Sequence, residues 1–142
     1  MSDAGTPHEL VSPDTMVAAR GFSHAVVAAP GNTVYVAGQI GVTSDGDIVG
    51  ETFVEQFDAA LANVVAALHA AGARPEHVVS VIVYTTVVDE YRAGLRAIGA
   101  VWREHFGRHF PAMALLGVTE LVVPAAVVEV VATAVIPQDI GP

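Results

Sequence analysis

The chain has 142 residues, of which 53% are hydrophobic, and its net charge is −9 at pH 7 because only six residues are basic. This length indicates one domain with a core of its own, and the negative charge makes nucleic acid and anionic membranes poor partners. The longest apolar runs are broken by Glu120, Pro124 and Glu129, so none reaches the roughly 18 residues that a membrane-spanning helix needs.

The N-terminus and the amino-acid usage narrow the class of protein further. The first residues have neither the basic start nor the apolar stretch of a signal peptide. There is no cysteine, which excludes a disulfide framework and thiolate metal ligands, and we expect a cytoplasmic protein. His105 and His109 are four residues apart, but Gly107 between them is expected to end the helix, so the two histidines do not share a helix face. We therefore expect neither a metal nor another cofactor.

The first half of the chain predicts strands followed by a helix. Residues 1–15, which contain Pro7 and Pro13, predict a loose N-terminal arm or a short edge strand. Residues 24–29 and 33–37 predict a hairpin closed by the turn 30–32. From Thr52 onward apolar residues recur at helical spacing as far as Gly72, which predicts a helix over 52–71.

The second half predicts one more helix between strands. Residues 77–85 are rich in β-branched side chains and predict a buried strand. A helix is expected over 89–106, with Asp89 as its N-cap and Gly107 as its end. Gly94 and Gly99 inside it each cost about 0.5–1 kcal/mol relative to alanine, so close packing is expected there. Strands over 112–118 and 125–136 complete the chain.

This order of elements predicts one α+β domain over residues 1–142, with two helices on one face of a mixed sheet. The other face of that sheet would be left bare. Since the chain is unusually apolar for a small domain, we expect this face to be covered by further copies of the chain.

Several short segments, in this order and at this spacing, resemble the RidA (YjgF) family of imine and enamine deaminases. The similarity extends from about residue 21 to 136 and is carried by residues 21–25, 32–40, 61–64, 81–86, 110–112 and the strand around Glu129. The resemblance implies a chorismate-mutase-like subunit that forms homotrimers. It also implies small-molecule clefts between neighbouring subunits.

The resemblance further implies which residues build the cleft. Family members hydrolyse 2-imino acids with a glutamate on the last strand that orients the attacking water, and Glu129 stands at that position. Gly38 and the backbone of Leu115 match positions that line the cleft. Without the resemblance, a glutamate on a strand is more often a solvated residue than a site residue.

At three cleft positions the chain departs from the family. Met113 stands where the family has the arginine that binds the substrate carboxylate, Phe22 replaces a tyrosine, and Ala37 replaces a serine. A thioether cannot bind a carboxylate as a guanidinium does, so we expect ordinary 2-imino-acid hydrolysis to be weak or absent. Arg20, two residues before Phe22, is the best candidate to supply the missing cation.

Two functions remain open from the sequence. The first is a divergent hydrolase or deaminase that acts on imine or enamine-like metabolites, with Glu129 as the catalytic residue. The second is a non-catalytic small-molecule-binding or regulatory trimer. Two interpretations of Met113 also remain open: an apolar lining residue, or a residue that selects an uncharged or aromatic ligand. For both functions the expected partners are copies of the chain and a small molecule, not nucleic acid or a membrane.

Overall fold

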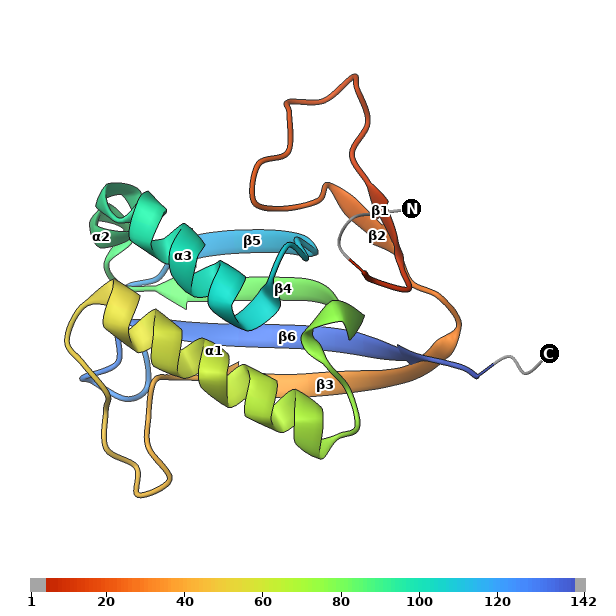
Figure 1. Cartoon of the computed structure of the whole chain (residues 1–142). Helices are drawn as coiled ribbons and strands as arrows, with labels where there is room; N and C mark the ends of the chain where they lie inside the picture. The colour runs from red at the N-terminus through yellow and green to blue at the C-terminus, as the bar shows by residue number, and fades with distance from the viewer. Residues whose placement is uncertain (1–4, 140–142) are drawn as a thin grey trace.

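In the computed structural model, which describes residues 5–139, a four-stranded mixed sheet carries the helices on one of its faces (Figure 1). The strands lie in the order β3 (Gly31–Gln39), β6 (Val128–Pro137), β4 (Val78–Thr85) and β5 (Ala112–Gly117). β4 and β5 are parallel, whereas the other neighbours are antiparallel. The predicted α+β architecture is therefore confirmed.

The long helix α1 (Phe53–Ala70) forms as the apolar spacing predicts. Thr52 caps its N-terminus by accepting a hydrogen bond from the backbone N–H of Glu55. One face of the helix packs on the sheet through the buried residues Phe53, Gln56, Phe57, Ala60, Leu61, Val64 and Leu68. The short 3-10 helix η1 (Pro75–His77) then leads into β4.

The expected helix over 89–106 is wrong as a single element, because the chain forms α2 (Val88–Ala93) and α3 (Leu95–Phe106). The break falls at Gly94, where a Cβ would come within 3.1 Å of the Glu90 carbonyl oxygen and 3.4 Å of Val54 Cγ2. Close packing is thus confirmed at Gly94, whose φ of −108° and ψ of 17° depart from helical values and separate the two helices. The structure does not use Asp89 as an N-cap; that place is taken by Val87, without a side-chain cap.

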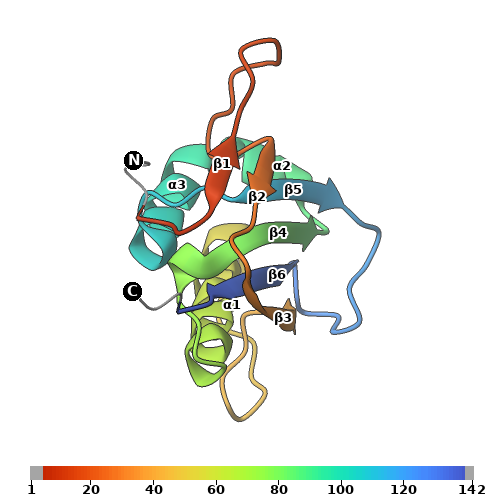
Figure 2. The ribbon, with the colours of Figure 1, turned by 90° about the vertical axis from the view of Figure 1, so that its right-hand side faces the viewer.

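The predicted hairpin over 24–37 is also wrong. The strand β2 (Ala25–Val27) pairs with β1 (Glu9–Val11) in a separate two-stranded sheet, and β3 pairs with β6 (Figure 2). Gly31 does not form a turn but allows β3 to approach β6 closely, since a Cβ there would lie 1.9 Å from the carbonyl oxygen of Ile136. Of the N-terminal arm, residues 9–11 form the edge strand, and residues 1–4 lie outside the described residues.

A buried histidine fastens this small sheet to the domain. His8 is 5% exposed, and its Nε2 donates to the carbonyl oxygens of His77 (3.0 Å) and Val135 (3.1 Å). Its Nδ1 accepts from the backbone N–H of Ala29 at 3.0 Å. The loop between β1 and β2 extends away from the domain body (Figure 1).

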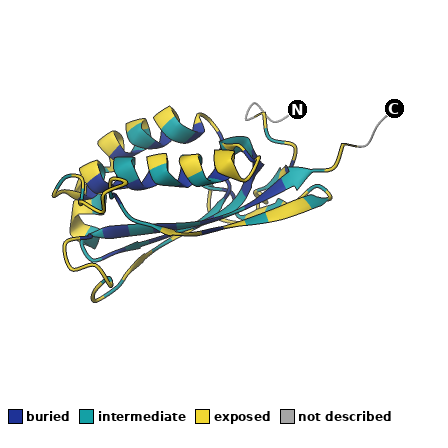
Figure 3. Ribbon diagram, turned by 90° about the horizontal axis from the view of Figure 1, so that it is seen from below, coloured by how far each residue is buried: buried dark blue, intermediate teal, exposed yellow. Residues whose placement is uncertain are grey.

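Helices cover only one of the two faces of the main sheet. On β6 the buried residues Val128, Val130, Ala132 and Ala134 alternate with the partly exposed Glu129, Val131 and Thr133. The buried set faces the helices, and the other set faces the uncovered side (Figure 3). That side presents large apolar groups, since Tyr35 is 81% and Leu116 46% exposed. None of the helices in the described part of the chain is both long and apolar enough to cross a bilayer.

Candidate functional site

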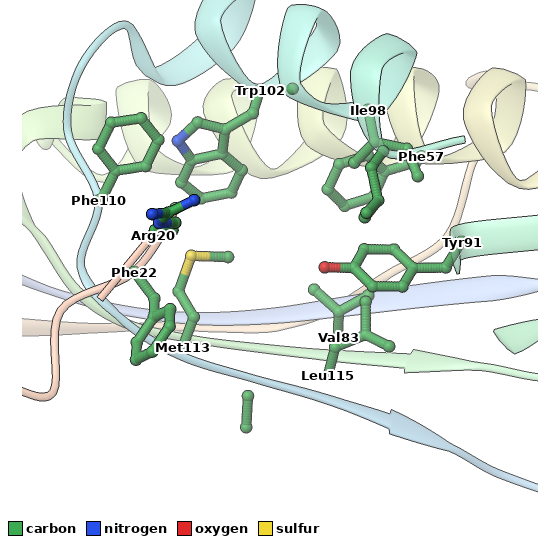
Figure 4. Close-up of a pocket in the computed structure, with 14 residues that line it drawn as sticks. Arg20, Phe22, Phe57, Val83, Tyr91, Ile98, Trp102, Phe110, Met113 and Leu115 are labelled. Carbon is green, nitrogen blue, oxygen red and sulfur yellow. The ribbon is translucent and has the colours of Figure 1, made fainter. Parts of the chain in front are cut away.

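A cavity of about 310 Å³ lies under α3, between that helix and the edge strand β5 (Figure 4). Most of its wall is apolar or aromatic. The residues of the wall that matter most for the chemistry are Arg20, Phe22, Tyr91, Trp102, Met113 and Leu115.

The strand β5 forms the floor of this cavity. Met113 pairs in register with Val81 on β4, and Leu115 pairs with Val83. Both valines are buried in the core between the sheet and the helices. Because paired residues of neighbouring strands share a face, Met113 and Leu115 point toward α3.

The roof of the cavity is held rigidly by Trp102. Its ring stacks on Phe106 with the centroids 4.2 Å apart, and its indole N–H donates to the carbonyl oxygen of His109 at 3.0 Å. Both contacts fix the orientation of the indole. The hydroxyl of Tyr91 points into the space below (Figure 4), and it makes no hydrogen bond to any other described residue.

The mouth of the cavity is formed by residues 20–22, which are anchored beside the start of β5. The backbone N–H of Ser23 donates to the carbonyl oxygen of Pro111 (3.0 Å), and its hydroxyl donates to that of Phe110 (2.6 Å). These bonds hold Phe22 and Arg20 against the cavity. The side chain of Arg20 has no ion-pair partner within residues 5–139, so its guanidinium is free to meet an anion.

A turn and an aromatic contact complete the mouth. Gly21 has a φ of +75°, a conformation that L side chains rarely adopt. The ring of Phe22 meets His24 edge to face at 5.1 Å, and Nε2 of His24 donates to the carbonyl oxygen of Val17 at 2.7 Å. His24 therefore braces the loop that carries the mouth.

Glu129 lies on the opposite face of the sheet. It pairs with Tyr84 of β4, and it is partly buried. Its side chain crosses Gly38, where a Cβ would come within 2.6 Å of Glu129 Oε1. Gly38 and Ala37 belong to a register shift in β3, of the kind that often re-aims side chains near functional sites.

The structure therefore divides the predicted site residues into two groups. One group lines the cavity and consists of Arg20, Phe22, Met113 and Leu115. The second group lies on the uncovered face and consists of Ala37, Gly38 and Glu129. Within one subunit the sheet separates the two groups, so they cannot contact the same small molecule.

The buried histidines belong to the scaffold. His109 is 1% exposed, its Nε2 donates to the carbonyl oxygen of Val78 at 2.7 Å, and its Nδ1 has no partner among the described residues. Burial lowers the pKa of His109, and it also lowers the pKa of His77. In residues 5–139 no three His, Cys, Asp or Glu side chains gather as a metal site requires.

Comparison with known proteins identifies the family. The family described as Endoribonuclease L-PSP matches residues 13–136, which is nearly all of the fold described above. The chain belongs to this family. It is the family that the sequence resembles, also called RidA or YjgF, and its members share the Rid fold.

Individual relatives agree with this assignment. A 2-iminobutanoate/2-iminopropanoate deaminase of Dermatophagoides farinae is 34% identical over 92 residues, which are 64% of this chain and 69% of that protein. The Rid-family protein YyfB of Yersinia pestis superposes with a TM-score of 0.82 at 32% identity, covering 91% of this chain and 98% of its own. For the YjgF/YER057c/UK114-family protein Rv2704 of Mycobacterium tuberculosis the TM-score is 0.61 at 30% identity, with coverages of 91% and 99%. The chorismate-mutase-like fold is therefore confirmed.

Most of the cavity residues of this Rid-family chain were not predicted as site residues, among them Tyr91, Gly99 and Trp102. Tyr91 and Trp102 belong to the apolar stripe of the second predicted helix, and a stripe does not distinguish a packed core from a cavity wall. Gly99 was expected to mark close packing, but a Cβ there meets only Arg103 Nη1 at 3.4 Å. The only signal in the sequence was a glycine inside a predicted helix.

Proposed function

We propose that the chain is an imine deaminase of the Rid type, which works as a homotrimer with its sites between subunits. The observation that carries the proposal is the cavity. Met113, Leu115 and Phe22, which stand at ligand-contacting positions of the family, all line it, and Arg20 supplies a free cation at its mouth. The similarity to a 2-iminobutanoate/2-iminopropanoate deaminase supports the same reaction class.

The separation of the two residue groups supports a site made by two subunits. Glu129 of one subunit cannot reach the cavity of the same subunit, because the sheet lies between them. The uncovered face around Glu129 also exposes Tyr35 and Leu116, which favours burial against a neighbour. Packing this face on the next subunit would bring Glu129 to the mouth of the neighbour's cavity.

In this arrangement each residue has a defined role. Arg20 binds the acidic group of the imine by charge-assisted hydrogen bonds. The carboxylate of Glu129 accepts a proton from a water molecule as the water oxygen bonds to the imine carbon. As the water oxygen bonds, the π electron pair moves to the imine nitrogen, which takes the proton held by Glu129 and gives the carbinolamine. The hydroxyl of the carbinolamine then passes its proton through Glu129 to the amine, the carbon–nitrogen bond breaks, ammonia leaves and the carbonyl product remains.

Turnover of freshly generated imines tests this proposal. An amino-acid oxidase with catalase produces the imines, and keto-acid and ammonia formation are followed with and without the protein. We expect Glu129→Gln to lower the rate of protein-catalysed imine hydrolysis, measured above the spontaneous rate, by about a hundredfold or more. Glu104→Gln, at an exposed position of α3, is the matched control and should retain the wild-type rate.

The alternative function gives a different result in the same experiment. A trimer that binds but does not hydrolyse would leave the spontaneous rate of imine hydrolysis unchanged, and it would still bind the keto-acid product. The replacement of three polar cleft residues by Met113, Phe22 and Ala37 is the feature of this chain that favours that outcome.

A further inference from the structure

We infer that the cavity under α3 binds a bulky apolar side chain, so that the preferred substrates are imines of aromatic or large branched 2-amino acids. The chemical step of this inference rests on the proposed function. The binding preference rests on the shape and lining of the cavity alone.

The volume of the cavity is the first support. At about 310 Å³ it is large for the methyl or ethyl side chain of a small imino acid. An apolar cavity of about 150 Å³ is enough to hold benzene. A phenyl, isobutyl or indole group can therefore enter, whereas a methyl group would leave most of the wall without contacts.

The lining of the cavity matches such a group. Phe57, Trp102 and Phe110 present aromatic rings, which favour edge-to-face or offset contacts with another ring. The thioether of Met113 adds a polarizable contact that suits an aromatic edge. A guanidinium at position 113 would place a charge in this space, so the methionine converts the position into part of an apolar wall.

Gly99 is the position that opens the space on the side of α3. Glycine destabilises a helix interior relative to alanine, and no neighbour crowds this one, since a Cβ would meet only Arg103 Nη1 at 3.4 Å. Helix stability and close packing therefore both fail to explain the glycine. The room that it leaves in the cavity explains it, and this makes Gly99 a specificity-determining residue.

The placement of charge sets the orientation of the ligand. Arg20 and Gly21 are exposed and lie at the mouth, whereas Phe57 and Trp102 of the lining are buried. A 2-imino acid with its carboxylate on Arg20 would insert its side chain under α3. Its imine carbon would then remain at the mouth, where water and the neighbouring subunit can reach it.

Relative turnover tests the inference. We expect kcat/KM for the imine of L-phenylalanine to exceed that for the imine of L-alanine by about tenfold or more. Gly99→Leu, which fills the cavity, should lower that ratio by about tenfold. Ala100→Leu adds the same side chain to an exposed position of α3 and should leave the ratio unchanged. A wild type without the preference, or a Gly99→Leu protein with an unchanged ratio, would overturn the inference.

Binding of the product keto acids separates this inference from the proposed reaction. Calorimetric titration with 3-phenylpyruvate and with pyruvate requires no turnover. Suppose that 3-phenylpyruvate binds more tightly than pyruvate, that Gly99→Leu removes the difference, and that no imine is hydrolysed. The inferred binding preference is then supported and the proposed deaminase activity is contradicted. If imines are hydrolysed but neither the wild type nor Gly99→Leu distinguishes the two keto acids, the deaminase activity is supported and the inferred binding preference is contradicted. A thermal melt confirms that each variant is folded.

Discussion

At the scale of single residues, the proposed site takes its positive charge from Arg20 and not from position 113. In the proposed site, Met113 takes the place of a carboxylate-binding arginine and points into an apolar cavity, and the guanidinium of Arg20 at the mouth supplies the charge instead. Glu129 is the proposed catalytic carboxylate, and the missing side chain of Gly38 gives it room to cross β3. Each of these three features can be altered separately.

Replacing Met113 by arginine should restore a contact for small carboxylates. Hydrogen bonds to a charged group contribute about 1.5–3 kcal/mol each, and a bidentate contact has two. We expect Met113→Arg to raise kcat/KM for the imine of L-alanine by about tenfold or more, and to lower it for the imine of L-phenylalanine. A wild-type rate on small imino acids that already equals that of arginine-bearing relatives would contradict this role of Met113.

Adding a methyl group at Gly38 should displace the carboxylate of Glu129. A Cβ there would come within 2.6 Å of Oε1 and 2.9 Å of Cδ, so the side chain must rotate away. A misplacement of about 1 Å can cost up to about a hundredfold in rate, so we expect kcat of Gly38→Ala to fall between tenfold and a hundredfold. Ser44→Ala, at an exposed position, is the control. Equal kcat values for Gly38→Ala and the wild type would contradict the placement of Glu129.

At the scale of elements, regular segments were predictable and pairings were not. The helix over 52–71 and the strands of the second half follow from periodicity, because their apolar residues face one core. The predicted hairpin over 24–37 is wrong because β2 pairs with β1, which precedes it, and β3 pairs with the ten-residue β6 near the other end of the chain. No local pattern encodes that choice. At Gly94 the sequence shows a glycine but not the neighbours that leave little room for a side chain there, among them Val54 of another helix.

The site was predictable only in part, and for a related reason. Family resemblance selected Met113 and Glu129 as candidates. Strand alternation places Glu129 on the face opposite the buried Val128 and Val130. The register that pairs Met113 with the buried Val81 is a tertiary fact. The cavity itself depends on the distance between α3 and β5, which composition does not determine.

Acid should destabilise the fold through His109, which joins the end of α3 to β4. Burial lowers its pKa below the ordinary value of 6.5, so the unfolded chain binds a proton at a pH where the folded chain does not. The free energy of unfolding should therefore fall as the pH drops below about 6.5 toward the folded pKa. Urea titrations at fixed protein concentration, at pH 7.5 and pH 5.5, measure this.

A matched pair of variants assigns the acid effect to its source. His109→Gln retains a side-chain donor for the Val78 carbonyl oxygen and removes the titration, so its stability should change less between the two pH values. His69→Gln, at an exposed position on α1, should behave as the wild type does. An equal pH dependence in His109→Gln and the wild type would show that other groups cause the acid loss.

At the scale of the whole molecule, one face of the sheet decides the assembly. We expect a stable trimer at micromolar concentration in sedimentation equilibrium, because the uncovered face exposes Tyr35 and Leu116. Tyr35→Glu should shift the protein toward monomers and abolish turnover. Ala66→Glu, on the exposed side of α1, should do neither. A monomeric wild type would contradict both the assembly and the shared site.

The overall charge leads to a further expectation about RNA. The family description names an endoribonuclease, but this chain has a net charge of −9 with only six basic residues. Since RNA binding depends on phosphate neutralisation, we expect no cleavage of a labelled single-stranded RNA at physiological salt. RNA cleavage that persists after further purification of the protein, and that is lost in Glu129→Gln, would contradict this expectation.

Mixed trimers test the central claim, that each site takes its cavity from one subunit and Glu129 from another. Met113→Trp fills the cavity, Glu129→Gln removes the carboxylate, and each variant alone should form inactive trimers. Co-refolding equal amounts should restore about a quarter of the wild-type sites, because that fraction of interfaces joins an intact cavity to an intact Glu129. Recovery of imine hydrolysis toward that level is the predicted result. Mixed trimers no more active than the separate variants would show that the two groups do not act together.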